Sequence, residues 1–206
     1  IDPALAGSIL KLANSSFFSY PGKIDTISKA VLVLGITEVY NLVIAYFSTQ
    51  AFKSVVTDKS YLESFWGRSV DCALLIKYLG SSLHVANVER LFILGLFHNL
   101  GELIVHQVSP EKISLCQSED IAVFPWEKQQ EVLGFTYAEC GAELLKMWQL
   151  PYSIVAPIRN QNESDFEQIN TESQLLYVAK NLMTSQFIHK SESHSSLPLT
   201  FSITDN

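Results

Sequence analysis

Residues 94–102 have the sequence LGLFHNLGE and lie inside a strongly apolar segment that runs from Val88 to Val105. Asn87 precedes this segment and is of a residue type that often begins a helix. Polar and small residues interrupt the segment at His98-Asn99-Leu100-Gly101. The uninterrupted apolar runs are far shorter than the roughly 18 residues of a membrane-spanning helix. We therefore predict a helical segment that is buried in a soluble core, and no membrane partner.

Helix start and stop signals recur on the N-terminal side of this segment. Thr26 is placed to cap a helix that stops at Gly35, and Thr37 is placed to cap the helix that follows. Asp58 opens a longer helix, which is expected to end at Gly80. Helices are therefore predicted to follow one another up to residue 80.

The C-terminal side shows the same kind of signals. Thr136 and Glu139 have the spacing of a capping box, in which each side chain accepts a hydrogen bond from the other residue's free backbone N–H. Pro157 is expected to bend its helix, because proline cannot donate to the helical hydrogen bonds. A short helix is predicted after Ser109-Pro110, and further helices over residues 125–134, 136–149, 152–160 and 172–189.

No segment shows the strict alternation of apolar and polar residues that is typical of a strand. The sequence therefore predicts an all-α fold in two helical halves that meet near residues 55–60. The halves are an N-terminal helical subdomain over residues 1–57 and a larger one over residues 58–190. Residues 191–206 are polar and serine-rich and are expected to form a flexible tail.

Composition excludes several classes of function. The net charge is −7 and the 14 basic residues are scattered along the chain, so a nucleic-acid partner is not expected. The three cysteines, Cys72, Cys116 and Cys140, are odd in number and lack C-x-x-C spacing, which favours a reducing cytoplasm. The chain begins at Ile1 without an initiator methionine, which suggests a piece of a longer protein.

The LGLFHNLGE stretch resembles the L-x-H-D-I-G-K core of HD-domain phosphohydrolases, and the chain from Asp2 to its last helix resembles their HDOD relatives. This resemblance implies an HD-like multi-helix bundle that forms one HDOD unit, with a further helix before Ile1. The remaining motifs that carry it are Asp2-Pro3-Ala4-Leu5-Ala6, Leu12-Ala13-Asn14-Ser15-Ser16-Phe17-Phe18, Ala30-x-x-x-Leu34-Gly35, Phe65-Trp66-x-x-Ser69 and Gly141-Ala142-Glu143-Leu144-Leu145-x-x-Trp148-x-Leu150-Pro151.

Active HD enzymes hold metal ions with His and Asp side chains, and a metal-bound water attacks a phosphoryl group. At the matching positions this chain has different residues: Arg68 for the first His, His98-Asn99 for the His-Asp pair, Glu102 for a Lys, Tyr137 for a later His, and Gln161-Asn162 for the His-His pair. Only His98 keeps a usual metal ligand, and Arg68 would repel a divalent cation. The resemblance therefore implies a vestigial site, with no catalytic residue and no bound metal.

These residues can also have purely structural roles. His98 would then be a core histidine that is hydrogen-bonded to a backbone carbonyl, and Asn99 would end a helical turn. Arg68 would form an ion pair with Glu102 or Glu139. The tryptophans lie on apolar stripes, which indicates core packing for Trp66, Trp126 and Trp148.

HDOD domains are taken to be output or adaptor modules of bacterial signal transduction, so the resemblance implies a non-catalytic role with a protein partner. Phe17, Phe18 and Tyr20 form the candidate interaction loop, unless these aromatic side chains are buried between the two halves. No cofactor is predicted, because the chain has no P-loop and no glycine-rich dinucleotide motif. The sequence does not indicate an oligomeric state.

Two other functions remain open at this point. One is a small-ligand sensor, in which the vacated metal pocket holds a nucleotide or another anion on Arg68. The other is a residual metal-dependent phosphohydrolase with an unusual ligand set around His98.

Overall fold

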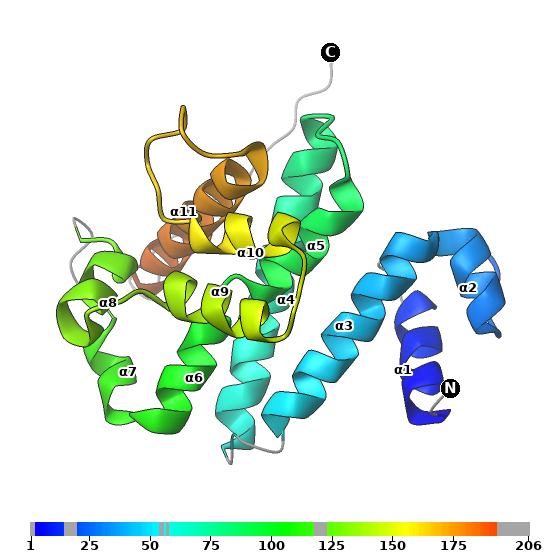
Figure 1. The fold of residues 1–206 in the computed structure, drawn as a ribbon, viewed down its shortest axis with the longest axis horizontal. Helices are drawn as coiled ribbons and strands as arrows, with labels where there is room; N and C mark the ends of the chain where they lie inside the picture. The colour runs from blue at the N-terminus through cyan, green and yellow to red at the C-terminus, as the bar shows by residue number, and fades with distance from the viewer. Residues whose placement is uncertain (1–2, 15–19, 54–55, 57, 118–122, 193–206) are drawn as a thin grey trace.

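The computed structural model describes residues 3–14, 20–53, 56, 58–117 and 123–192, and within them the chain forms α-helices and no strand (Figure 1). The all-α prediction is therefore confirmed. The helices are α1 (Pro3–Ala13), α2 (Ile27–Leu34), α3 (Ile36–Lys53), α4 (Lys59–Ser82), α5 (Val88–Phe97), α6 (Leu100–Val108), α7 (Glu111–Leu115), α8 (Pro125–Leu133), α9 (Tyr137–Met147), α10 (Tyr152–Arg159) and α11 (Thr171–Glu192).

Two main hydrophobic cores organise these helices. Helices α1, α2 and α3 enclose the smaller core, which includes Ile9, Ala30 and Leu42. The larger core is built around α4 and α5, which lie side by side at the centre of the molecule (Figure 1). The boundary at residue 57 stays a prediction, because α3 contributes to both cores: its C-terminal half places Ala45 and Phe52 in the larger one.

Polar contacts also join α3 to the central helices. Lys77 Nζ on α4 lies 2.5 Å from Glu38 Oε1, and this carboxylate is almost completely buried. Asn41 Nδ2 donates a hydrogen bond of 2.8 Å to the carbonyl oxygen of Glu89 at the start of α5. The two halves are thus connected by one continuous helix and by contacts along its N-terminal half.

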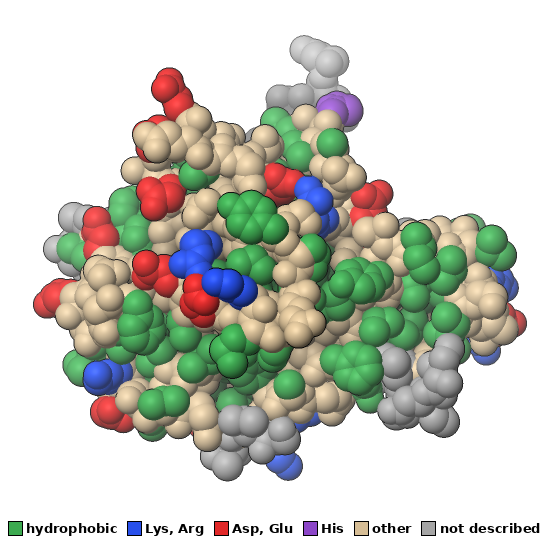
Figure 2. Space-filling view, viewed as in Figure 1, with side chains coloured by type: hydrophobic (Ala, Val, Ile, Leu, Met, Phe, Trp, Pro, Cys, Tyr) green, Lys and Arg blue, Asp and Glu red, His purple; other side chains and the backbone are tan. Residues whose placement is uncertain are grey.

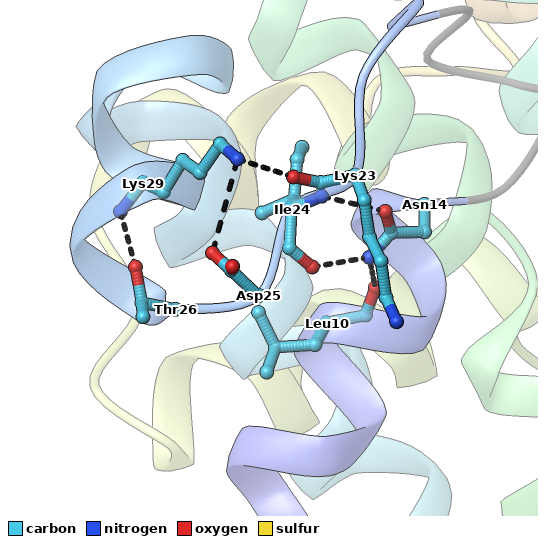
Figure 3. Close-up of polar contacts among 7 residues, drawn as sticks. All are labelled: Leu10, Asn14, Lys23, Ile24, Asp25, Thr26 and Lys29. Carbon is cyan, nitrogen blue, oxygen red and sulfur yellow. Dashed lines mark hydrogen bonds and ion pairs between the residues drawn. The ribbon is translucent and has the colours of Figure 1, made fainter.

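The end of α1 is held against the segment that leads into α2 (Figure 3). Asn14 Nδ2 donates to the carbonyl oxygens of Leu10 and Ile24, and the backbone N–H of Ile24 donates to Asn14 Oδ1 at 2.8 Å. Thr26 then caps α2 by accepting a hydrogen bond from the backbone N–H of Lys29 at 3.1 Å. An asparagine therefore pairs with both backbone groups of Ile24, which fixes the return of the chain.

Several predicted caps are confirmed. Asp58 caps α4 by accepting from the backbone N–H of Tyr61, and Thr136 and Glu139 form the complete capping box of α9. Gly134 ends α8 with a positive φ of 78°, which a glycine adopts without strain. Pro157 lies inside α10, as expected.

Two predicted helix ends are wrong. Gly80 does not end α4, which continues to Ser82; a Cβ at Gly80 would lie 2.0 Å from Leu91 Cδ1, so this glycine allows α4 and α5 to pack closely. Thr37 does not cap α3, because α3 already begins at Ile36. The reason is Gly35: with φ at 88° it turns the chain from α2 into α3 within a single residue.

The apolar segment around residue 98 forms two helices in the core. Val88–Val108 is the one stretch of the described residues whose length and composition would allow it to cross a membrane, although no such run was expected. Its apolar window is 67% buried inside the molecule, as in the core helix of a soluble protein. Asn99 separates α5 from α6, at the polar interruption that the sequence shows.

Candidate functional site

A cavity of about 520 Å³ lies between α4, α6, α8, α9 and α11. Six of the seven residues that were predicted to mark a vestigial site line it together: Arg68, His98, Asn99, Glu102, Tyr137 and Asn162. Gln161 does not line it and is completely buried beside it. The structure thus brings together residues that are up to 94 positions apart in the sequence, from Arg68 to Asn162.

Two glycines allow the helices around the cavity to approach one another. A Cβ at Gly95 on α5 would lie 2.4 Å from the Ala73 Cα of α4. A Cβ at Gly101 on α6 would lie 2.2 Å from the carbonyl oxygen of Tyr137 on α9. Any larger residue would push these backbones apart, so both glycines help to set the positions of the cavity walls.

Glu102 is the centre of the polar network in the cavity. Its Oε1 accepts a hydrogen bond of 2.7 Å from the Tyr61 hydroxyl and lies 2.6 Å from Arg68 Nη2, while its Oε2 accepts from the Asn99 amide. The expected ion pair of Arg68 is therefore formed with Glu102. Glu139 is not the partner, because its carboxylate closes the capping box with Thr136.

His98 is held by a backbone group, as the structural interpretation predicted. Its Nδ1 lies 2.6 Å from the carbonyl oxygen of Gly95, and because a carbonyl can only accept, Nδ1 carries the proton. Burial, together with the nearby positive charge of Lys180, lowers the pKa of His98 to about 4. His98 is therefore neutral near pH 7, with its lone pair on Nε2.

The neighbouring positions 161 and 162 have different roles. Gln161 Nε2 donates to the carbonyl oxygen of His98 at 2.6 Å and to that of Ile158 at 2.8 Å, which ties the end of α10 to the α5–α6 junction. Asn162 faces the cavity, where its Oδ1 accepts a hydrogen bond from Lys180 Nζ. Only the second of these side chains is therefore part of the cavity wall.

Lys180 on α11 is a cavity residue that the sequence analysis missed. Its Nζ lies 4.6 Å from the centroid of the Trp126 ring, and burial lowers its pKa to about 7. Lys180 follows the fully buried Leu176 by four residues, so a lysine on the buried stripe of the last helix was the signal that could have revealed it.

Trp126 differs from its prediction as a core residue. It lines the cavity, with one face toward Lys180, and it stacks on Phe124 at a centroid distance of 4.5 Å. Trp66 and Trp148, in contrast, pack against the larger core as predicted.

The donor set does not fit a catalytic divalent metal. Within the described parts of the chain, no group of three or more His, Cys, Asp or Glu side chains is placed to hold a metal ion. Glu102 already has three hydrogen-bond donors, and Asn162 Oδ1 already accepts from Lys180. Arg68 and Lys180 also place positive charge in the cavity, which would oppose a dication.

The candidate interaction loop is only partly described. Phe17 and Phe18 lie outside the described residues. The side chain of Tyr20 is 39% exposed, and its ring lies close to Gly22, where an added Cβ would come within 2.9 Å of it.

The model of the HDOD domain matches residues 1–164, which is most of the sequence. The chain belongs to the HDOD domain family. The match and the helical architecture together confirm the predicted HD-like fold, and the last helix, α11, lies beyond the matched residues. The residues at the predicted HD motif positions thus gather around one cavity of an HDOD fold, and the correspondence of this cavity to the metal site of HD phosphohydrolases stays a prediction.

Known proteins support the same fold. An uncharacterized protein of Treponema pallidum (strain Nichols) is 27% identical over 201 residues, and the match covers 96% of this chain but 38% of that protein. A crystal structure of a Geobacter sulfurreducens HDOD domain protein of unknown function has a TM-score of 0.74 at 20% identity, with 90% of this chain and 63% of that chain covered. This HDOD chain thus spans well under half of the Treponema relative.

A Shewanella amazonensis SB2B protein, provisionally named a phosphohydrolase, has a TM-score of 0.73 at 28% identity, with 91% of this chain and 67% of that chain covered. A Marinobacter aquaeolei VT8 protein, provisionally named a signal transduction protein, has a TM-score of 0.69 at 25% identity, with 90% and 43% covered. An HDOD domain with such neighbours fits a role in signalling.

Proposed function

We propose that this HDOD domain is a non-catalytic signal-transduction module that acts by binding another protein. The observation that carries the first part of the proposal is the ion pair between Arg68 and Glu102. By the resemblance, Arg68 stands at the position of the first metal-binding His of HD enzymes, and a fixed positive charge that is paired with Glu102 supports the loss of the metal site. An Asn at position 99 further removes the carboxylate that would follow the motif histidine.

Metal content and phosphodiester hydrolysis test the loss of catalysis. We expect protein purified without chelator or nickel to hold less than about 0.1 transition metal per chain, because His98 alone cannot hold a metal tightly. Hydrolysis of bis(p-nitrophenyl) phosphate with added Mn²⁺ should equal that of the buffer. Stoichiometric metal together with turnover would contradict the proposal if both disappear in His98→Asn. The matched control is His84→Asn, which changes an exposed histidine and should then keep both.

Exposed apolar side chains on the N-terminal half support a protein partner. Leu32 on α2 is 85% exposed, and Ile36, Tyr40 and Phe47 on α3 are also exposed. Hydrophobic side chains are correspondingly frequent on the surface of this half (Figure 2). Tyr20 belongs to the same half of the molecule, so the candidate interaction loop and the α2–α3 surface together are the proposed contact region.

Partner capture by the full-length protein tests this contact region. Phe18→Ala with Tyr20→Ala should leave the melting temperature nearly unchanged and abolish capture of the partner that the natural protein retains. Tyr152→Ala is the matched control, because Tyr152 is an exposed tyrosine on α10 in the other half. Capture that is lost equally in the control, or unfolding of the double variant, would contradict the assignment of the loop.

The three free cysteines agree with our proposal of a cytoplasmic location.

A further inference from the structure

We propose that the cavity binds a small organic anion, whose charged oxygen atoms are held by Lys180 Nζ and Ser69 Oγ. The binding site consists of residues of α4, α7, α8 and α11 and of the loop after α10. The proposal does not depend on the protein partner proposed above, because it concerns the interior of the cavity and not the α2–α3 surface.

Charge is the first observation that supports an anionic ligand. Arg68 is neutralised by Glu102, whereas the described contacts of Lys180 are the neutral Asn162 amide and the Trp126 ring. An ammonium group has three N–H donors, so these contacts leave one donor for a ligand. When Lys180 is protonated, the cavity wall as described therefore carries one cation in excess of its carboxylates.

Ser69 is a second and independent observation. Ser69 is almost completely buried, with 1% of its surface exposed, and it lines the cavity. Among the described residues, Ser69 Oγ has no hydrogen-bond partner. Buried hydroxyl groups are nearly always hydrogen-bonded, so an acceptor atom of a ligand in the cavity would satisfy it.

The positions of the two groups are consistent with a shared ligand. Ser69 on α4 and Lys180 on α11 line the same cavity, and α11 packs against α4. A carboxylate, phosphate or sulfonate has several acceptor oxygens and can bind both donors at once.

The remainder of the cavity favours a compact apolar body on this anion. A volume of about 520 Å³ is typical of small-molecule sites, which span roughly 300–1,000 Å³. Phe65, Ile113 and Met183 supply apolar wall. The Trp126 ring already contacts Lys180 and stacks on Phe124, so it is partly occupied by neighbours within the protein.

Calorimetric titration with three matched probes tests the proposal. Benzoate and phenyl phosphate carry the two common anionic groups, and benzyl alcohol is a neutral compound of similar shape. We expect at least one anion to bind at one site per chain and benzyl alcohol to bind at least about tenfold more weakly, since hydrogen bonds to charged groups are the stronger ones. The relative affinity of the two anions shows whether a carboxylate or a phosphate is preferred.

Variants identify the residues that hold the anion. Lys180→Met should weaken binding by at least about tenfold, and Ser69→Ala by roughly two- to tenfold. Lys146→Met is the matched control, because it removes the same charge from an exposed position on α9 outside the cavity, and it should leave the affinity unchanged. Circular dichroism establishes that each variant is folded, and Ser69→Ala decides the question if Lys180→Met does not fold.

Two outcomes would overturn the proposal. One is that neither anion binds the wild-type protein below about 10 mM, which is weaker than the millimolar affinities that one charged contact can give. The other is that an anion binds but Lys180→Met and Ser69→Ala retain the wild-type affinity. Neither outcome affects the tests of metal content and partner capture, so failure of this proposal is distinguishable from failure of the proposed function.

Discussion

Replacement of Gly95 by alanine should separate the two central helices and destabilise the protein. The added Cβ would lie 2.4 Å from Ala73 Cα, 2.7 Å from Ala73 N and 2.8 Å from Ile76 Cγ2. Non-bonded carbon atoms approach to about 3.5 Å at closest, so α5 would have to move away from α4 by about 1 Å. The nearest atoms belong to the Ala73 backbone and cannot rotate away, so the movement must involve a whole helix.

The expected loss of stability is about 2 kcal/mol. Overpacking of a core costs typically about 1–3 kcal/mol or more, and alanine recovers up to about 1 kcal/mol through its higher helix propensity. For a domain of this length, about 2 kcal/mol corresponds to a fall in melting temperature of about 4–8 °C. Thermal and urea unfolding followed by circular dichroism measure both quantities.

Gly67→Ala is the matched control for Gly95→Ala. Gly67 also lies in a helix, on an exposed part of α4, and an added Cβ would meet no atom within 4 Å. Its replacement should therefore raise the melting temperature by about 2–4 °C, through helix propensity alone. If Gly95→Ala is as stable as Gly67→Ala, the close approach of α4 and α5 at Gly95 does not exist.

Three further predictions concern the cavity and the cap of α9. Glu102→Gln should lower the free energy of unfolding by about 2 kcal/mol. A double-mutant cycle with Arg68→Met should show a coupling energy of at least about 1 kcal/mol, and effects that add within about 0.5 kcal/mol would contradict the ion pair. The pKa of Lys180 is lowered to about 7 in the folded protein, whereas the same lysine in the unfolded chain has a pKa near 10.5. Between these two pH values the unfolded state therefore binds up to one proton more than the folded state. The free energy of unfolding should therefore rise with pH from about 7 by at most about 1.4 kcal/mol per pH unit, and urea titrations should show a flatter rise for Lys180→Met; equal slopes would refute the shift. Thr136→Ala should cost about 1 kcal/mol by removing the acceptor for the Glu139 N–H, measured by urea unfolding, and an unchanged midpoint would rule out the capping box.

Local signals explain why most helix boundaries could be predicted. Thr26, Asp58 and Thr136 act through hydrogen bonds within a few residues, so their capping roles can be recognised from sequence alone. Gly80 has the residue type of a helix end, but its role depends on Leu91 of another helix. Such a tertiary contact is not visible in local spacing, and this is why the end of α4 was predicted two residues too early.

The candidate site was predictable to the extent that a family motif marks it. The motif positions located six cavity residues, and the charge of Arg68 indicated an ion pair with Glu102 or Glu139, of which the structure shows the pair with Glu102. Lys180 and Trp126 lie outside the motif positions, so no spacing relates them to the cavity, and Ser69 belongs to the Phe65-Trp66-x-x-Ser69 motif but was not assigned to the site. Their roles arise from the packing of α8 and α11 against α4, which only the folded chain defines.

The continuity of α3 has a consequence for how this domain unfolds. One helix of 18 residues takes part in both hydrophobic cores, and Glu38 and Asn41 attach its first half to α4 and α5. Neither core can lose its structure without exposing apolar surface of the same helix, so the free energies of the two cores are linked. Calorimetry should accordingly record one cooperative transition, with equal calorimetric and van't Hoff enthalpies, where two independent lobes would give two.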